Sequence, residues 1–442
     1  MVNIYKAKAK PSLQGKILTL TIDSADYEVQ GIAQYQQKIT FVAGALPGEQ
    51  VQVRINEDKA GYLKASTLKV LRAAAERVQP PCEFAGRCGG CQLQHLSSAD
   101  QQRLKQQGID SLIRHQTGLD QLPWQAMLTA QPDGYRRRAR IGLWFDKKQR
   151  KLTVGFRQAG DKQLTPISHC RVLSAPLMPI FAVLQQVVAT LDNPAGITHA
   201  EVIDAQGQPV VIVRHVTALS EAEKQQFIAA WPEAIWLGEA EAGVFSYWQH
   251  RQQLLQYQLT TQQLQLQFAP DDFIQVNQAV NQQMVTQALD WLQLTADDTV
   301  LDLYAGIGNF TLALAQRAKT VRAVEGVAKM VQQLATNAKL NGLSNIEAFQ
   351  ADLHLPWPKA AWHQRDYTKV VLDPARAGAQ GAVEQVILLK PAQILYISCN
   401  AATFARDAKV LLAGGYRLDK LGGIDMFPHT SHLEVMALFS RQ

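Results

Sequence analysis

The chain has 442 residues, more than one compact hydrophobic core usually holds, so we expect two or three domains. Hydrophobic residues make up 47% and charged residues 19%, as in an ordinary globular protein, and no apolar run is long enough to cross a membrane. The net charge is a modest +6, and the first ten residues are basic without the apolar core of a signal peptide, so we expect a cytoplasmic protein.

Short strand-like runs fill the segment 1–74. They lie at 17–22, 39–42, 51–55 and 63–71, with a turn at Leu46-Pro47-Gly48. So many short strands in so short a segment predict a small β-barrel of the OB type. The phrases Gly31-Ile32-Ala33 and Thr40-Phe41-Val42, followed by the turn, resemble the TRAM domain, an RNA-binding barrel of RNA-modifying enzymes. Ten basic against six acidic residues up to Arg72 suit RNA.

Four of the five cysteines belong to the next segment, 75–268. Cys82, Cys88 and Cys91 fall within ten residues, and Cys170 is the natural fourth member of the set. Four thiolates suit either a zinc ion or an iron–sulfur cluster, and spacing alone does not separate the two. A chance grouping of inert thiols is the remaining alternative. An odd number of cysteines argues against a disulfide framework.

A basic hairpin over 135–156 is the other marked feature of the central segment. Nine Lys or Arg and one acid lie between Gly134 and Arg157, with aromatic residues among them. Cations mixed with aromatics favour RNA with unstacked bases, and the alternative is a solvated strand face. We also expect a helix at 97–118 that could pack on the catalytic domain, a hairpin at 199–216, a capped helix at 220–231, and loops or solvated strands at 249–267.

Strands and helices alternate from residue 269 to 442, which predicts a doubly wound, Rossmann-like α/β sheet. The expected strands are 300–304, 321–325, 345–350, 369–372, 394–400 and 433–439. The glycines of the loop 305–309 let the backbone approach a ligand. Glu325 can accept both ribose hydroxyls, and Asp352 the adenine amino group. The third glycine of a nicotinamide site is missing, and Asp302 favours S-adenosylmethionine (SAM).

Two residues of this segment are candidates for chemistry. Cys399 follows a buried strand and precedes a helix-like segment, whose N-terminus favours a thiolate, so this residue is either a nucleophile or a buried structural cysteine. Glu434 lies in an apolar run. Burial there is expected to raise the pKa of its carboxyl toward the range useful for proton transfer, unless it faces solvent.

Four motifs resemble the RNA (uracil-5-)-methyltransferases. They are 300–310, 372–378 (Leu-Asp-Pro-Ala-Arg-Ala-Gly), Ser398-Cys399-Asn400 and 425–434 (Asp-Met-Phe-Pro-His-Thr-Ser-His-Leu-Glu). Together with the TRAM-like start and the four cysteines, they extend the resemblance over nearly the whole chain, and the members that act on 23S ribosomal RNA look most similar.

The resemblance implies the site residues. Cys399 would be the nucleophile and Glu434 the base, and a [4Fe–4S] cluster would be held by Cys82, Cys88, Cys91 and Cys170. SAM would be bound by Gln275, Tyr304, Asn309, Glu325, Asp352 and Asp373.

The expected reaction is methylation of C5 of a flipped-out uridine in a single-stranded or loop region of 23S rRNA, by a monomer with no membrane partner. Addition of a thiolate at C6 makes C5 nucleophilic. The alternatives are the same chemistry on another rRNA or tRNA uridine, or a non-catalytic RNA-binding iron–sulfur protein. A cytosine-5 enzyme fits less well, because Pro374 stands where such enzymes usually carry a cysteine.

Overall fold

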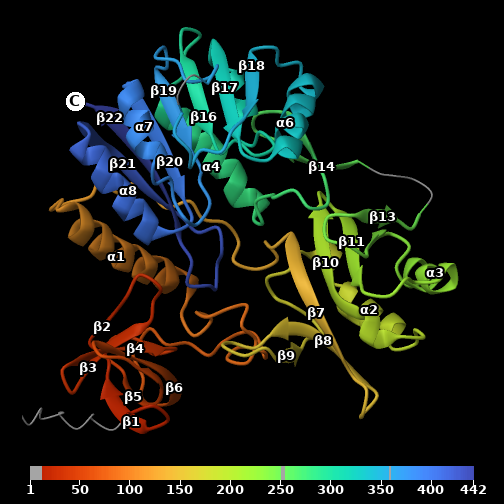
Figure 1. Ribbon diagram of the computed structural model, residues 1–442. Helices are drawn as coiled ribbons and strands as arrows, with labels where there is room; N and C mark the ends of the chain where they lie inside the picture. The colour runs from red at the N-terminus through yellow and green to blue at the C-terminus, as the bar shows by residue number, and fades with distance from the viewer. Residues whose placement is uncertain (1–11, 250–253, 358–359) are drawn as a thin grey trace, which may run out of the picture. The chain divides into compact units, whose positions relative to one another are not determined.

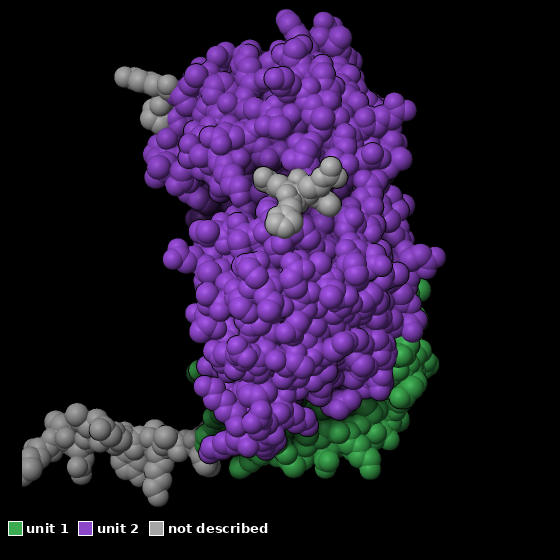
Figure 2. Space-filling model, turned by 90° about the vertical axis from the view of Figure 1, so that its right-hand side faces the viewer, with its two compact units in different colours: residues 1–81, 92–111 green, residues 82–91, 112–442 purple. Residues whose placement is uncertain are grey.

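The computed structural model describes residues 12–249, 254–357 and 360–442. The basic N-terminal segment, for which no signal peptide is expected, lies outside these residues. The contacts divide the chain into two compact units, 1–81 with 92–111 and 82–91 with 112–442 (Figure 2). The boundaries expected at 74 and 268 stay predictions. Within the described ranges, no helix is both long enough and apolar enough to cross a membrane.

Six strands form the sheet of the first unit, in the order β1-β5-β6-β4-β3-β2. They are β1 (Ile17–Thr21), β2 (Ser24–Ala25), β3 (Gly31–Tyr35), β4 (Lys38–Ala43), β5 (Gln50–Asp58) and β6 (Tyr62–Arg72). In β5 the alternate residues Val51, Val53 and Ile55 are buried, and each contributes about 1.5–3 kcal/mol. The four strands expected from the sequence are confirmed.

Helix α1 (Ser98–Thr117) follows, and its residues up to Ser111 belong to this unit. Ser97 Oγ accepts a hydrogen bond from the Asp100 backbone N–H at 3.2 Å and so caps the helix.

The second unit begins with a seven-stranded sheet in the order β13-β12-β11-β10-β7-β8-β9 (Figure 1). Its strands are β7 (Arg138–Asp146), β8 (Lys151–Arg157), β9 (Leu164–Pro166), β10 (Ile197–Ala205), β11 (Gln208–His215), β12 (Ile235–Glu239) and β13 (Phe245–Tyr247). The helices are α2 (Ile180–Val188) and α3 (Glu221–Ala230), and the capping box at Ser220 is present. Both hairpins expected from the sequence are confirmed.

A third hairpin differs in part from the prediction. The strands β14 (Leu255–Leu259) and β15 (Leu264–Phe268) pair where loops or solvated strands were predicted, and residues 250–253 lie outside the described part. Their glutamines alternate with apolar residues, and the apolar side is buried in the core that also holds Val300. Alternation with a period of two is typical of a strand with one buried side, but the high glutamine content led to the prediction of loops or solvated strands.

The catalytic sheet has the order β18-β17-β16-β19-β20-β22-β21. Its strands are β16 (Thr299–Leu303), β17 (Thr320–Glu325), β18 (Ile346–Gln350), β19 (Lys369–Leu372), β20 (Gln393–Ser398), β21 (Tyr416–Ile424) and β22 (Glu434–Arg441). The first five strands are parallel, as expected, but β22 runs antiparallel between β20 and the unpredicted β21.

Helices cover both faces of this sheet (Figure 1). They are α4 (Gln278–Leu292), α5 (Thr311–Ala315) and α6 (Ala328–Leu340) on one face, and α7 (Ala382–Leu389) and α8 (Ala401–Ala413) on the other.

Candidate active site

The carboxyl ends of four neighbouring parallel strands bring predicted site residues to one edge. Leu303 of β16 pairs with Val324 of β17 and with Leu372 of β19, and Leu372 pairs with Tyr396 of β20. The site residues at or just after these ends are Tyr304, Glu325, Asp373 and Cys399. Asp352 follows β18, the next strand outward. Such an edge is where open α/β sheets bind ligands.

Glu434 reaches this edge from the antiparallel strand. Ser398 of β20 pairs with Val435 of β22, so the register continued by one residue sets Cys399 opposite Glu434. The Glu434 side chain is buried, with 5% of its surface exposed. Burial, with a further contribution from Asp373, raises the pKa of the Glu434 carboxyl to about 8, which confirms the expected direction.

Cys399 behaves differently from the expectation. Burial first, then the carboxyls of Glu434 and Asp373, raise the pKa of its thiol to about 11, against a lowering by Arg376. Two backbone N–H groups at the N-terminus of α8 are occupied by Asn400 and do not hold the Cys399 sulfur. Asn400 Oδ1 accepts from the backbone N–H groups of Ala402 and Thr403 at 3.0 and 3.5 Å.

The buried carboxyls outnumber the cations at this edge. Burial raises the pKa of Asp373 to about 7, and burial also raises that of Asp302 to about 7, although Thr311 Oγ1 donates to Asp302 at 2.5 Å. Arg376, two residues past Pro374, is the cation that lowers the pKa of both Cys399 and Glu434. From the sequence, Arg376 had no predicted role, although it stands in the quoted motif.

The Gly-rich loop is tied to Glu325. The backbone N–H groups of Gly306 and Val327 donate to its two carboxylate oxygens at 3.0 and 2.9 Å. Tyr304, at the start of the loop, has φ +64°, a conformation that bulky residues rarely adopt. Its hydroxyl is buried and has no hydrogen-bond partner among the residues that the structure describes, and burial raises its pKa to about 12. A strained residue with an unsatisfied hydroxyl is typical of a ligand site.

Gln275 and Asn309 are held by groups that sequence reasoning missed. Asn309 exchanges two hydrogen bonds of 2.9 Å with the side-chain amide of Asn281 and accepts another from the Tyr257 hydroxyl at 3.1 Å. The buried Gln275 accepts at its backbone carbonyl from Arg137 Nε at 2.6 Å. Asp352 is exposed, and its carboxylate accepts from the His354 backbone N–H at 2.9 Å.

These residues fit a cationic methyl donor. The edge holds three carboxyls with raised pKa against one nearby arginine, so a ligand with positive charge would relieve their repulsion. The sulfonium of SAM carries such a charge, and the free Tyr304 hydroxyl offers a hydrogen bond.

Three of the four cluster cysteines come together. Cys82, Cys88 and Cys170 border one hydrophobic core, and no disulfide joins any of the five cysteines. Burial raises the pKa of the Cys170 thiol, and Cys88 and Cys82 raise it further. Cys91 instead lies near Tyr135. In the described part of the chain, no three His, Cys, Asp or Glu side chains are grouped tightly enough for one metal ion. Four thiolates are the donor set that a [4Fe–4S] cluster uses, so the residue types suit such a group.

Two of the three consecutive arginines are not available to RNA, contrary to the prediction. Arg137 is 3% exposed and lies 4.5 Å over the Tyr257 ring. Arg138 pairs with Glu201 at 2.5 Å and donates to the backbone carbonyls of Asp272 and Pro270. Both arginines therefore join the central sheet to the segment before α4.

Six of the other seven basic residues between Gly134 and Arg157 are exposed, and Arg136 is half-buried. The exposed six are Arg140, Lys147, Lys148, Arg150, Lys151 and Arg157. Trp144 on β7 is 66% exposed, and Figure 1 shows the turn between β7 and β8 extending beyond the neighbouring strands. Exposed cations beside an exposed aromatic ring agree with the predicted surface for unstacked bases.

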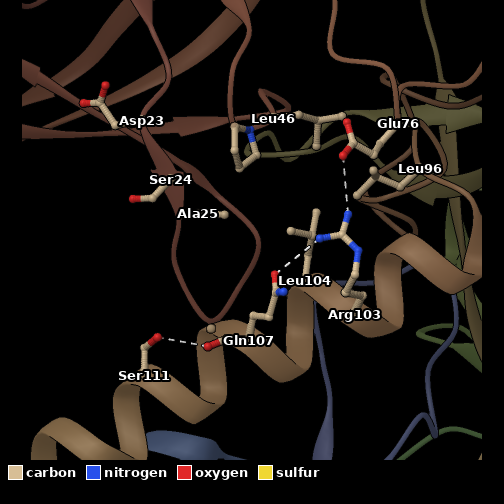
Figure 3. Close-up of a pocket in the computed structure, with 12 residues that line it drawn as sticks. Asp23, Ser24, Ala25, Leu46, Glu76, Leu96, Arg103, Leu104, Gln107 and Ser111 are labelled. Atoms are coloured by element: carbon tan, nitrogen blue, oxygen red, sulfur yellow. Dashed lines mark hydrogen bonds and ion pairs between the residues drawn. The ribbon is translucent and has the colours of Figure 1, made fainter.

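A pocket of about 350 Å³ in the first unit contains none of the predicted site residues (Figure 3). Within its lining, Arg103 Nη2 lies 3.6 Å from Glu76, and Arg103 Nη1 donates to Gln107 at 3.4 Å. The candidate active site is therefore the strand edge and not this pocket.

Comparisons with known proteins agree with the geometry. The TRAM domain model matches residues 11–68, and the model described as tRNA (Uracil-5-)-methyltransferase matches 249–352 and 360–442. The N-terminal TRAM fold is thereby confirmed.

Curated relatives match over the full length. The chain is 42% identical over 444 residues to the 23S rRNA (uracil(1939)-C(5))-methyltransferase RlmD of Vibrio cholerae serotype O1 (strain M66-2), covering 100% of both chains. It is 40% identical over 437 residues to the enzyme of the same name from Pectobacterium atrosepticum, covering 98% of this chain and 96% of that one.

A solved structure supports the fold. The Pyrococcus abyssi tRNA (uracil-54, C5)-methyltransferase, crystallised with S-adenosyl-L-homocysteine, is 21% identical, with a TM-score of 0.71 over 96% of this chain and 100% of that one. The chain belongs to the RNA (uracil-5-)-methyltransferase family.

Proposed function

We propose that this protein methylates C5 of uracil 1939 in 23S rRNA, using SAM as the methyl donor. Full-length identity of 40–42% to relatives that carry this name supports the target. The observation that carries the chemistry is the facing pair of Cys399 and buried Glu434 beside Asp373 at the carboxyl edge of the sheet.

Cys399 is the nucleophile. Its sulfur adds to C6 of the flipped uracil, and the electron pair of the C5–C6 bond moves toward the O4 carbonyl, so C5 gains carbanion character. SAM supplies an electrophilic methyl group to that carbon. Arg376 favours the thiolate, because its cation opposes the carboxyls that raise the pKa of the thiol.

Glu434 is the base. After methylation, C5 carries both the methyl group and its original proton, and aromaticity returns only when that proton leaves. A raised pKa of about 8 makes the Glu434 carboxylate a stronger base than an exposed carboxylate, and the positive charge of bound SAM favours the ionised form that accepts the proton. As the proton goes to Glu434, the C6–S bond breaks and its electron pair returns to Cys399.

The SAM contacts are proposed from the edge geometry. Glu325 accepts from the ribose, Asp352 from the adenine amino group, and Tyr304 and Asp373 line the site, with Gln275 and Asn309 completing it. The bonds of Glu325 to the loop support its part, because they fix its carboxylate at the end of β17.

The four cysteines would hold a [4Fe–4S] cluster, which acts as a scaffold, since methyl transfer moves no electrons to or from the protein. The shared burial of Cys82, Cys88 and Cys170 supports this assignment. Protein purified without air should contain about four iron atoms per chain. Cys170→Ser should lose iron as completely as Cys88→Ser. Zinc in place of iron, or full iron in Cys170→Ser, would contradict the assignment.

The RNA-binding elements would be the TRAM sheet and the exposed turn of the β7–β8 hairpin, in a protein that works as a cytoplasmic monomer. Mass spectrometry of 23S rRNA fragments treated with the protein and SAM tests the function. Methylation of uracil 1939 at C5, absent with Cys399→Ala, is the expected result. Methylation at another uridine would reassign the target, and no transfer to any uracil would leave an RNA-binding protein without this activity.

A further inference from the structure

Polar contacts join the residues after Cys170 to the segment 133–136. The Arg171 guanidinium forms a bidentate ion pair with the Asp133 carboxylate, Nε to Oδ1 at 2.7 Å and Nη2 to Oδ2 at 2.6 Å. The backbone continues the contact, since the Gly134 N–H donates to the Arg171 carbonyl at 2.9 Å and the Arg136 N–H to Val172 at 2.8 Å. Residues 133–136 are therefore fixed to the cysteine-bearing segment.

The same short segment contacts the loop 425–433, which we call the catalytic loop because Glu434 follows it. His429 Nε2 lies 3.3 Å from Asp133 Oδ1, the oxygen that also accepts from Arg171. The Tyr135 hydroxyl donates to the Pro428 carbonyl at 3.1 Å, and the Arg136 guanidinium lies 5.7 Å over the Phe427 ring. The carboxylate of Asp133 thus contacts both Arg171, next to Cys170, and His429 of the catalytic loop.

The catalytic loop depends on such outside contacts. His429 has φ +68°, a conformation unfavourable for this side chain, and it is buried. A residue in such a conformation keeps it only where its surroundings hold it. Downstream, His432 Nε2 lies 3.3 Å from Arg376, so the loop also contacts the cation of the active site.

We propose that Asp133 is a positioning residue, which holds His429 and through it sets the place of Glu434, so that the segment after Cys170 and the catalytic carboxyl are mechanically joined. This inference rests on the proposed role of Glu434 as the base. A base acts only within hydrogen-bond reach of its proton, so a displaced loop slows removal of the C5 proton more than the earlier addition of Cys399.

Asp133→Asn is a mild change for stability. The Asp133 and Arg171 side chains are 39% and 42% exposed, and ion pairs with that exposure contribute little to folding. The variant keeps the size of the side chain and all four cluster cysteines. Asp366→Asn is the matched control, because Asp366 also contacts an arginine, Arg322, through both oxygens at 2.9 and 3.1 Å, and no candidate site residue takes part.

The test measures turnover and trapped adduct on a 23S rRNA fragment with SAM. Asp133→Asn should lower kcat roughly tenfold, leave KM for SAM and the iron content as in the unaltered protein, and accumulate a covalent protein–RNA band on a denaturing gel. Asp366→Asn should do none of this. A simple loss of folding would not produce the band, since the adduct needs bound RNA and an active Cys399.

Unchanged kcat without a band would overturn the inference, and so would a joint loss of iron, SAM binding and adduct. Failure of the proposed function gives a different pattern, in which the unaltered protein transfers no methyl group to uracil and Glu434→Gln traps no RNA. If those two proteins behave as expected and only Asp133→Asn is indistinguishable from the control, the positioning role alone is wrong.

Discussion

Burial and neighbouring carboxyls oppose ionisation of both Cys399 and Glu434. With pKa values near 11 and 8, the free protein at neutral pH holds a neutral thiol and a mostly protonated carboxyl. This protects the thiol from side reactions until ligands arrive. A bound sulfonium brings a positive charge to the edge and favours the thiolate, so donor binding and activation of the nucleophile are linked.

Alkylation of Cys399 should report this link. With iodoacetamide, the rate for the Cys399 peptide, followed by mass spectrometry, should rise with pH toward a midpoint near 11 in the free protein. Because positive charge favours the thiolate, SAM should move the midpoint to lower pH, and neutral S-adenosyl-L-homocysteine should move it less. A midpoint near the ordinary thiol value in the free protein, or equal shifts by both ligands, would refute the electrostatic account.

At the scale of elements, periodic patterns located most strands, and residues at strand ends located the catalytic edge. The sequence could not show which face of β7 would be covered. Arg137 and Arg138 are both covered by segments that lie more than a hundred residues away in the chain. The cap of α8 by Asn400, a local contact, was also not predicted.

The exposed basic residues at the turn of the β7–β8 hairpin should bind RNA, whereas the covered Arg138 should not, and variants can test the two separately. Replacing Lys147, Lys148, Arg150 and Lys151 by Gln should weaken RNA binding, because fewer backbone phosphates are then neutralised. The slope of log K against log salt should fall by up to about 0.7 for each phosphate that the protein no longer neutralises.

The control is Arg138→Gln, which should leave that slope unchanged. It should instead lower the free energy of unfolding by about 1–3 kcal/mol, because two backbone carbonyls lose their donor. A salt slope that responds to Arg138 and not to the hairpin turn would assign RNA binding to the other face.

The central sheet and the catalytic sheet of the second unit share one hydrophobic core. One hydrophobic core contains Ile203 and Ile212 of the central sheet together with Met284 and Val300 of the catalytic domain. Because side chains of both regions share this core, the central sheet and the catalytic edge are packed as one body. A flipped uridine held by the hairpin can then be presented to Cys399 in a fixed geometry.

The central claim is that Cys399 adds to the base before methyl transfer and that Glu434 acts after it. Glu434→Gln keeps the shape of the side chain but accepts no proton, so the methylated adduct cannot release its sulfur. On a denaturing gel with a 23S rRNA fragment and SAM, this variant should give a slow covalent protein–RNA band that requires SAM and is absent from the Cys399→Ala, Glu434→Gln double variant. Normal turnover by Glu434→Gln, or a band that survives loss of Cys399, would contradict the account.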